Sequence, residues 1–202
     1  MKKSLFIGLA LIVAALGYWL ATNKPAQLVR EHSPIIGPDQ APVTLVEFVD
    51  PACEACRAMF PYVKQIMKEH PNQIKLVVRY MNFHKESEEA IRILEAARKQ
   101  GAFENAFAVL FAFQPVWAPH GHEGKSPWEF ISKTDINIAQ AKQDAHSSEI
   151  MKNVHQDMQD AKAFGVQKTP SFFVNGAPLK LLHPDALRDM VQQALAKNQE
   201  AT

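Results

Sequence analysis

Only two cysteines occur among the 202 residues, and the formal net charge is +1. Two cysteines are too few for a disulfide-rich scaffold, and a chain of this length with 47% hydrophobic residues can bury the core of one domain without such a scaffold. The near-zero net charge offers no basic face for binding phosphates, so we expect no nucleic-acid partner. No internal repeat or low-complexity tract is visible, which excludes solenoid and disordered architectures.

The two cysteines, Cys53 and Cys56, form a C-x-x-C pair within VTLVEFVDPACEACRAMF. Tetrahedral zinc would need two further ligands, but the chain has no second C-x-x-C, and the only close histidine pair, His120 and His122, falls in a distant loop. A structural disulfide between positions three apart would close a very small loop and remove little entropy from the unfolded chain. The pair therefore favours redox chemistry. A metal site and a structural disulfide are the weaker alternatives, and we expect no bound metal.

The N-terminus combines a basic pair, Lys2 and Lys3, with an uncharged apolar run at 5–21, the order typical of a secretory signal. As a helix, this run would reach roughly 26 Å, just short of the ~30 Å hydrocarbon core of a bilayer. We therefore expect residues 1–21 to be either a cleaved signal peptide or a membrane anchor. The lysines predict a cytoplasmic N-terminus, which places the rest of the chain in a periplasmic or other extracytoplasmic, oxidising compartment, either free or anchored to the inner membrane.

Two short β-branched and apolar runs, 43–49 and 74–80, predict buried strands. Between them, apolar residues recur at helical spacing up to Pro71, which predicts a helix and hence a strand–helix–strand unit. Cys53 lies where this helix begins, and the unpaired N–H groups there favour a thiolate. Cys53 is therefore expected to be the attacking residue, because the thiolate is the nucleophile of disulfide exchange. Cys56, one turn deeper, is expected to resolve mixed disulfides.

A helical pattern follows, and strands return only after it. The helical stretches are predicted at 87–100, 103–113 and 136–164, with a loop at 114–127. SFFVNG and PLKLL then predict two short strands joined at Asn175–Gly176, before a last helix at about 184–197. Thr169–Pro170 directly precedes the first of these strands, and from the residues alone a trans bond is the expectation there.

Three segments, VEFVDPACEAC, ARKQGAFENAFAVLF and AKAFGVQKTPSFFVNGAPL, resemble the DsbA-type thioredoxin-fold thiol-disulfide oxidoreductases, a family of exported bacterial enzymes. The resemblance runs from about residue 35 to the end of the last helix. It implies an α/β fold, namely a thioredoxin fold with an inserted helical domain, and no cofactor beyond the redox-active disulfide Cys53–Cys56. Together with the leader, it divides the chain into a signal peptide or anchor at 1–21, a tether at 22–34, a first thioredoxin part with the C-x-x-C at 35–83, an inserted helical domain at 84–164, and a second thioredoxin part with a cis-proline at 165–202.

The resemblance also implies roles for other residues. Thr169 and Pro170 would be joined by a cis bond, face the sulfur of Cys53 and bind the substrate backbone. Glu47 matches the family's buried acidic residue, which helps to move the proton of Cys56. The implied partners are exported proteins with thiols or disulfides and a membrane redox partner. We expect a monomer that touches the membrane only through its N-terminal segment, if that segment is uncleaved.

The sequence departs from the family between the cysteines, where strongly oxidising members carry Pro-His and this chain carries Glu54 and Ala55. A carboxylate beside Cys53 should disfavour its thiolate, which predicts a higher Cys53 pKa and a less oxidising pair. The expected function is nonetheless that of a dithiol oxidase that introduces disulfides into exported proteins. A disulfide reductase or isomerase of the same fold is the alternative, and a metal-handling protein is a weaker one.

Overall fold

The computed structural model describes residues 25–119 and 121–200. The predicted leader at 1–21, the first residues of the predicted tether and His120 lie outside the described residues. Within the described ranges, no helix has the length and apolar character needed to cross a membrane.

Five strands form one mixed sheet in the order β1-β3-β2-β4-β5. The strands are β1 (Ile35–Ile36), β2 (Val43–Val49), β3 (Ile74–Tyr80), β4 (Ser171–Val174) and β5 (Ala177–Pro178). β2 and β3 run parallel, as a strand–helix–strand unit requires, whereas β4 lies antiparallel to β2. β2 is thus a central strand, and its C-terminal end leads directly into the cysteine pair.

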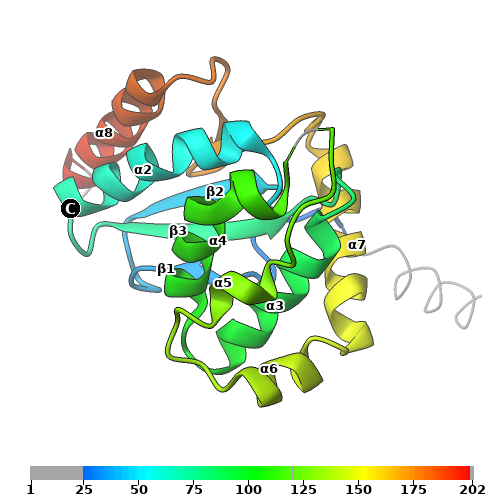
Figure 1. The fold of residues 1–202 in the computed structure, drawn as a ribbon. Coiled ribbons are helices and arrows are strands. Elements are labelled where there is room, and N and C mark those ends of the chain that lie inside the picture. Colours follow the sequence, from blue (N-terminus) through cyan, green and yellow to red (C-terminus); the bar gives the residue numbers. More distant parts are fainter. Residues whose placement is uncertain (1–24, 120, 201–202) are drawn as a thin grey trace, which may run out of the picture.

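Seven helices are described around this sheet. They are α2 (Glu54–Glu69), α3 (Ser87–Lys99), α4 (Phe103–Trp117), α5 (Trp128–Ile131), α6 (Ile138–Asp144), α7 (Ser148–Ala163) and α8 (Pro184–Glu200), the first of these sitting between β2 and β3. In Figure 1, α2 and α8 lie beside each other above the sheet, while α3 to α7 fill the lower and right-hand part of the view, with α4 next to α2. The helical segment therefore reaches the element that carries the cysteines.

Side chains alternate across a strand, so Leu45 and Glu47 point to one face of the sheet and Val46 and Phe48 to the other. The first face forms the larger core, together with buried residues of α2, α3, α4 and α8. The second face packs against α7 and the segment that precedes β1. Glu47 is thus a carboxylate inside the larger core, on the same face as buried Cys56.

Buried ion pairs connect the segment at 25–34 to the elements on the second face of the sheet. The Arg79 side chain, which is fully buried on β3, donates to Asp157 at 2.9 Å and to Asp160 at 2.6 Å, both on α7. Arg30 donates to Asp160 at 2.7 and 2.8 Å, and His32 lies 2.7 Å from Asp157. Asp157 and Asp160 therefore each have an arginine partner, which offsets the cost of their desolvation.

Several predicted elements are confirmed, and three need correction. The strands at 43–49 and 74–80 match β2 and β3 residue for residue. The helix predicted at 103–113 continues through Pro115 to residue 117, because a proline in the last turn still leaves the Ala118 N–H free to donate to the Gln114 carbonyl. The stretch at 136–164 is two helices, α6 and α7, since Ser147 caps the second by accepting from Glu149 N–H. PLKLL is a strand only at its first position: β5 ends at Pro178.

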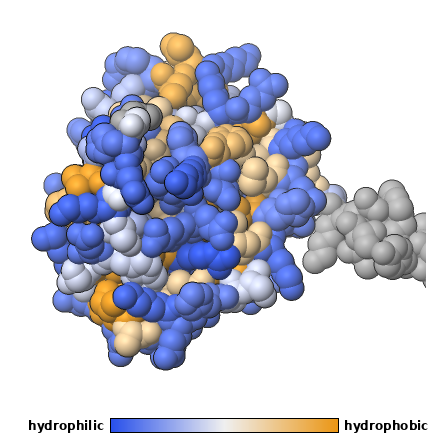
Figure 2. Space-filling view, turned by 45° about the vertical axis from the view of Figure 1, so that its right-hand side comes forward, coloured by the Kyte–Doolittle hydropathy of each residue, from blue (hydrophilic) through white to orange (hydrophobic). Residues whose placement is uncertain are grey.

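The face that Figure 2 shows is largely polar. Its hydrophobic residues form small separate patches between hydrophilic ones. Most of the large apolar side chains of the described residues are instead buried in the core.

Candidate active site

Cys53 lies at the junction of β2 and α2. It is the N-cap residue of α2, with an extended backbone (φ −77°, ψ 122°), and its N–H donates to the Asp50 carbonyl at 3.0 Å. Its side chain is half-buried, whereas Cys56, one turn further along α2, is fully buried. Both are free thiols. The structure therefore offers one accessible sulfur and one sheltered sulfur, as predicted from their positions.

Thr169 and Pro170 lie against this sulfur. The thiol of Cys53 donates to the Thr169 carbonyl at 3.4 Å, and the Thr169–Pro170 bond is cis. The expectation from the residues alone, a trans bond, is therefore wrong, and the expectation from the resemblance is right. Pro170 is buried and Thr169 is half-buried at the start of β4.

The two cysteines have pKa values shifted in opposite directions. A hydrogen bond from Cys56 lowers the pKa of Cys53 to about 5, helped by a hydrogen bond from the Thr169 side chain and by backbone N–H groups of α2, against the opposing effect of burial. Burial raises the pKa of Cys56 far above its ordinary value, and the hydrogen bond to Cys53 and the charge of Glu47 raise it further. At neutral pH the reduced site thus holds a thiolate on Cys53 and a thiol on Cys56.

Glu47 is a buried carboxyl group near both sulfurs. Neither of its oxygens has a hydrogen-bond partner within the described part of the chain. Burial raises its pKa to about 8, and the negative charge of Cys53 contributes to the rise. A group with this pKa can hold a proton at neutral pH and release it without a large cost, which is the property a proton carrier needs.

Glu54 and Ala55 are both exposed on the first turn of α2. The largest effects on the pKa of Cys53 come from Cys56, from burial and from Thr169. The predicted influence of Glu54 on the pair remains a prediction. Solvent screens the charge of an exposed side chain, so any effect should be small and should depend on salt.

Asp50 is a site residue that sequence reasoning missed. It is fully buried, and its carboxylate accepts from the Ala52 N–H at 2.9 Å, the Phe83 N–H at 2.8 Å and the Ser87 hydroxyl. His84 also contacts it at 2.8 Å through Nδ1. Asp50 thereby joins the turn before Cys53 to the loop between β3 and α3. The only signal in the sequence was its position three residues before the pair.

Gln114 is the second missed residue, since the sequence placed it in a loop. It lies instead on α4 with 1% of its surface exposed. Its amide nitrogen donates to the Pro51 carbonyl at 2.7 Å and to the Cys53 carbonyl at 2.9 Å. Its amide oxygen accepts from Arg57 Nε at 3.0 Å. The helical segment thus contacts the backbone of the cysteine turn directly.

The metal alternative finds no support in the described geometry. Among the residues at 25–119 and 121–200, no three His, Cys, Asp or Glu side chains are grouped so that they could hold a metal ion. His122 is exposed, and its ring lies 3.2 Å from the carbonyl of the neighbouring Glu123. His120, its predicted companion, is outside the described residues.

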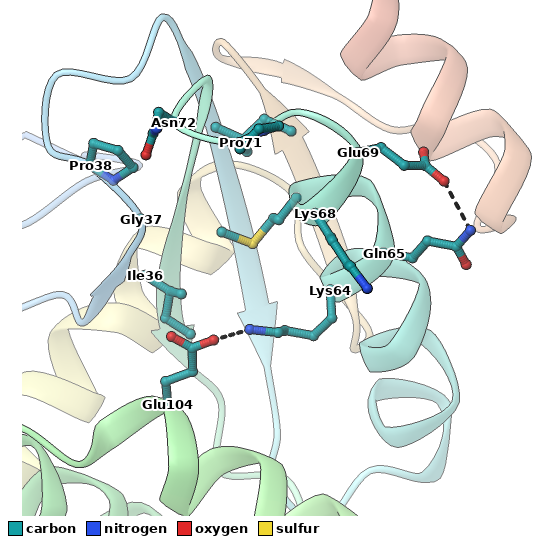
Figure 3. A pocket seen from close by; sticks show the side chains of 12 residues that line it. Ile36, Gly37, Pro38, Lys64, Gln65, Lys68, Glu69, Pro71, Asn72 and Glu104 are labelled. Atoms are coloured by element: carbon teal, nitrogen blue, oxygen red, sulfur yellow. Dashed lines mark hydrogen bonds and ion pairs between the residues drawn. The ribbon is translucent and has the colours of Figure 1, made fainter.

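A hollow of about 970 Å³ lies at the other end of α2. Figure 3 shows Lys64 and Glu104 pointing toward each other across one side of it, with Ile36 nearby, and the two charged groups form an ion pair. Its lining does not include Cys53 or Thr169, so it is separate from the cysteine site.

Comparisons with known proteins agree with this geometry. Residues 30–193 match the family model described as thioredoxin. A thioredoxin-like oxidoreductase from Silicibacter pomeroyi DSS-3 is 27% identical, with a TM-score of 0.71 over 86% of this chain and 98% of that one. Oxidised BdbD from Bacillus subtilis is 24% identical, with a TM-score of 0.69 over 81% of this chain and 93% of that one. These structures confirm the predicted thioredoxin-like fold with inserted helices.

One curated relative is much longer than this chain. The Na(+)/H(+) antiporter NhaA 1 of Mycobacterium sp. (strain KMS) is 30% identical over 162 residues, which make up 78% of this chain and 25% of that protein. The chain thus spans about a quarter of the length of this relative.

Proposed function

Because this chain belongs to the thioredoxin family, we propose that it is a thiol-disulfide oxidoreductase that uses the Cys53–Cys56 pair. The proposed direction is that of a dithiol oxidase for exported proteins. The observation that carries the proposal is the position of Cys53 at the N-terminus of α2 and beside Thr169, where the contacts with Cys56, Thr169 and backbone N–H groups lower its pKa to about 5. A stabilised thiolate favours the reduced form of the pair. A stabilised reduced form makes the disulfide a stronger oxidant of other thiols.

The proposed reaction begins with the Cys53–Cys56 disulfide. A substrate thiolate attacks Sγ of Cys53, a substrate–Cys53 disulfide forms, and the Cys53–Cys56 bond breaks. Cys56 leaves with the electron pair and takes up one proton. A second substrate thiolate then attacks the substrate sulfur of the mixed disulfide, and Cys53 leaves as a thiolate. The substrate has lost two electrons, and the cysteine pair has gained them.

Glu47 is proposed to serve the proton transfer in the first of these steps. Cys56 leaves into a buried site where its own thiolate is strongly disfavoured. A carboxyl group with a pKa of about 8 on the same face of the sheet is protonated at neutral pH and can supply that proton. Thr169 and Pro170 are proposed to bind the backbone of the substrate beside Cys53.

The proposed partners follow from the reaction. The substrates are exported proteins that carry pairs of thiols. The electrons gained by the cysteine pair must leave the protein, and a membrane redox partner linked to quinones is proposed to accept them. We place the chain in the periplasm or a comparable extracytoplasmic compartment, as a monomer, with the N-terminal segment as its one contact to the membrane if it is uncleaved.

A reductase of the same fold is the second candidate, because Ala55 stands where strongly oxidising members carry the histidine that stabilises the thiolate, and Glu54 adds a carboxylate beside Cys53. A reductase would be kept reduced by a membrane thiol donor and would pass electrons to substrate disulfides.

The equilibrium of the cysteine pair in glutathione buffers, measured on the full chain, separates these functions. A reduction potential near about −120 mV, that of a strong oxidant, supports the oxidase. A potential near about −270 mV, that of thioredoxin, supports the reductase and overturns the proposal. A Cys56→Ser variant, which cannot form the internal disulfide, is the control for the signal of the pair.

A further inference from the structure

Gln114 is the one polar side chain among the buried residues of α4. The others are Phe103, Ala106, Phe107, Leu110, Phe111 and Trp117. An amide in such surroundings costs free energy unless its hydrogen bonds are made. Gln114 makes three of them, and all three go to the turn at 51–53 or to the first turn of α2.

The partners determine how this amide is oriented. The Pro51 and Cys53 carbonyls can only accept, so the NH₂ group must face them. The Arg57 guanidinium can only donate, so the amide oxygen must face it. The opposite orientation would place an oxygen against two carbonyl oxygens. The site therefore requires two donors and one acceptor at this position, which an apolar or acidic side chain of similar size does not provide.

Gln114 closes a set of bonds that holds the cysteine turn from two sides. Asp50 accepts from the Ala52 N–H at 2.9 Å through its side chain and from the Cys53 N–H at 3.0 Å through its carbonyl. Gln114 binds the Cys53 carbonyl, which also accepts the first helical bond from the Arg57 N–H at 3.1 Å. The backbone N–H and C=O of Cys53 are thus both fixed.

We propose that Gln114 is a positioning residue of the redox reaction, which holds the Cys53 backbone so that the sulfur stays beside Thr169 and the N-terminus of α2. It does not touch the sulfur and acts through the backbone of Cys53. The helical segment thereby sets the properties of a thiolate that belongs to the thioredoxin part. The inference rests on Cys53 as the reacting thiol of the proposed function, but it holds for either direction of electron flow.

The test compares Gln114→Met with Trp117→Phe in the full chain. The methionine keeps the length of the side chain but removes all three hydrogen bonds. Trp117→Phe removes a buried hydrogen bond within the same helix, from the indole N–H to the Leu110 carbonyl at 2.7 Å, and leaves the cysteine turn untouched. Both variants are therefore expected to lose stability, and only the first should change the thiol chemistry.

Two measurements are made on each variant: the pH titration of the Cys53 thiolate by its ultraviolet absorbance, and the equilibrium with glutathione. For Gln114→Met we expect a higher titration midpoint and a glutathione equilibrium shifted by about tenfold toward the disulfide. For Trp117→Phe both should match the wild type. Equal values for Gln114→Met and the wild type, or equal shifts in both variants, would overturn the proposal.

A third variant keeps the test decisive if Gln114→Met fails to fold. Gln114→Glu preserves the shape of the side chain, and its carboxylate has no donors for the two carbonyls. We expect the same direction of change, larger above the pKa of the introduced group than below it. An unchanged midpoint in this variant would also overturn the proposal. The Gln114 proposal is tested by differences between variants, whereas the oxidase proposal is tested by the wild-type reduction potential. Either proposal can therefore fail while the other is supported.

Discussion

The sulfur of Cys53 lies 3.4 Å from the carbonyl oxygen of Thr169, although the two residues are 116 positions apart in the chain. β4 lies beside β2 in the sheet, and this pairing brings the start of one strand to the end of the other. The contact places a hydroxyl-bearing residue where the thiolate forms. A hydrogen bond from that side chain is one of the causes that lower the pKa of Cys53.

Replacing the Thr169 hydroxyl should therefore weaken the thiolate. Thr169→Val keeps the shape of the side chain and removes the donor, so we expect the pKa of Cys53 to rise from about 5, by roughly one unit. Titration of the thiolate absorbance measures the change. Thr169→Ser retains a hydroxyl and is the matched control. A valine variant with the wild-type midpoint would show that the hydroxyl does not stabilise the thiolate.

Glu54→Gln tests the dipeptide between the cysteines. If the Glu54 carboxylate disfavours the thiolate, its removal should lower the pKa of Cys53 and make the pair more oxidising. Because Glu54 is exposed, we expect a shift of less than about one unit that shrinks as salt is added. The titration is repeated at low and high ionic strength. A rise of the midpoint, or a shift that salt does not change, would contradict this electrostatic explanation.

The sequence could predict those parts of the site that depend on local pattern. The two long strands are β-branched and apolar runs, and the cysteine pair follows one of them, so the sulfurs and the helix start were placed correctly. Asp50 and Gln114 could not be assigned in this way. The distant partners of Asp50, Phe83 and His84, come from a loop more than thirty positions later. Gln114 resembled the start of a loop because Pro115 follows it. Such contacts depend on tertiary packing, which spacing along the chain does not encode.

Arg79 should be required for the stability of the fold. Arg79→Met would leave Asp157 and Asp160 buried without this partner, so we expect a loss of about 3–5 kcal/mol in the free energy of unfolding, measured by urea denaturation. Lys125→Met is the control, because it breaks an exposed pair with Glu129 at 3.7 Å and should cost less than about 1 kcal/mol. Equal losses in both variants would show that burial does not determine the strength of these ion pairs.

Replacing Glu47 should change the stability and the activity of the protein in opposite directions. The pKa of Glu47 rises from 4.5 to about 8 in the folded protein, mainly through burial. Between pH 4.5 and pH 8 the Glu47 side chain has lost its proton in the unfolded chain but keeps it in the folded one. The contribution of this group to the free energy of unfolding is therefore complete below about pH 4.5 and is lost as the pH rises through 8. The free energy of unfolding should therefore fall with pH in this window, by at most about 1.4 kcal/mol per unit from this group.

Measurements on the oxidised protein isolate this effect, because Cys53 then carries no charge. Burial, the main cause of the raised pKa, remains in that state, while the contribution of the Cys53 charge disappears. Glu47→Gln should remove the slope, and Glu47→Leu should in addition raise stability, by about 1–3 kcal/mol at neutral pH, since it removes two buried oxygens without partners.

Activity should change in the opposite direction. If the Glu47 carboxyl supplies the proton that Cys56 takes up, Glu47→Gln and Glu47→Leu should both slow the oxidation of a dithiol peptide by about tenfold or more. The slowing should be greatest below pH 8, where the wild-type carboxyl is protonated, and small above it. Variants that lose the slope in stability but keep the wild-type rate at every pH would show that Glu47 titrates in the folded protein without taking part in the reaction.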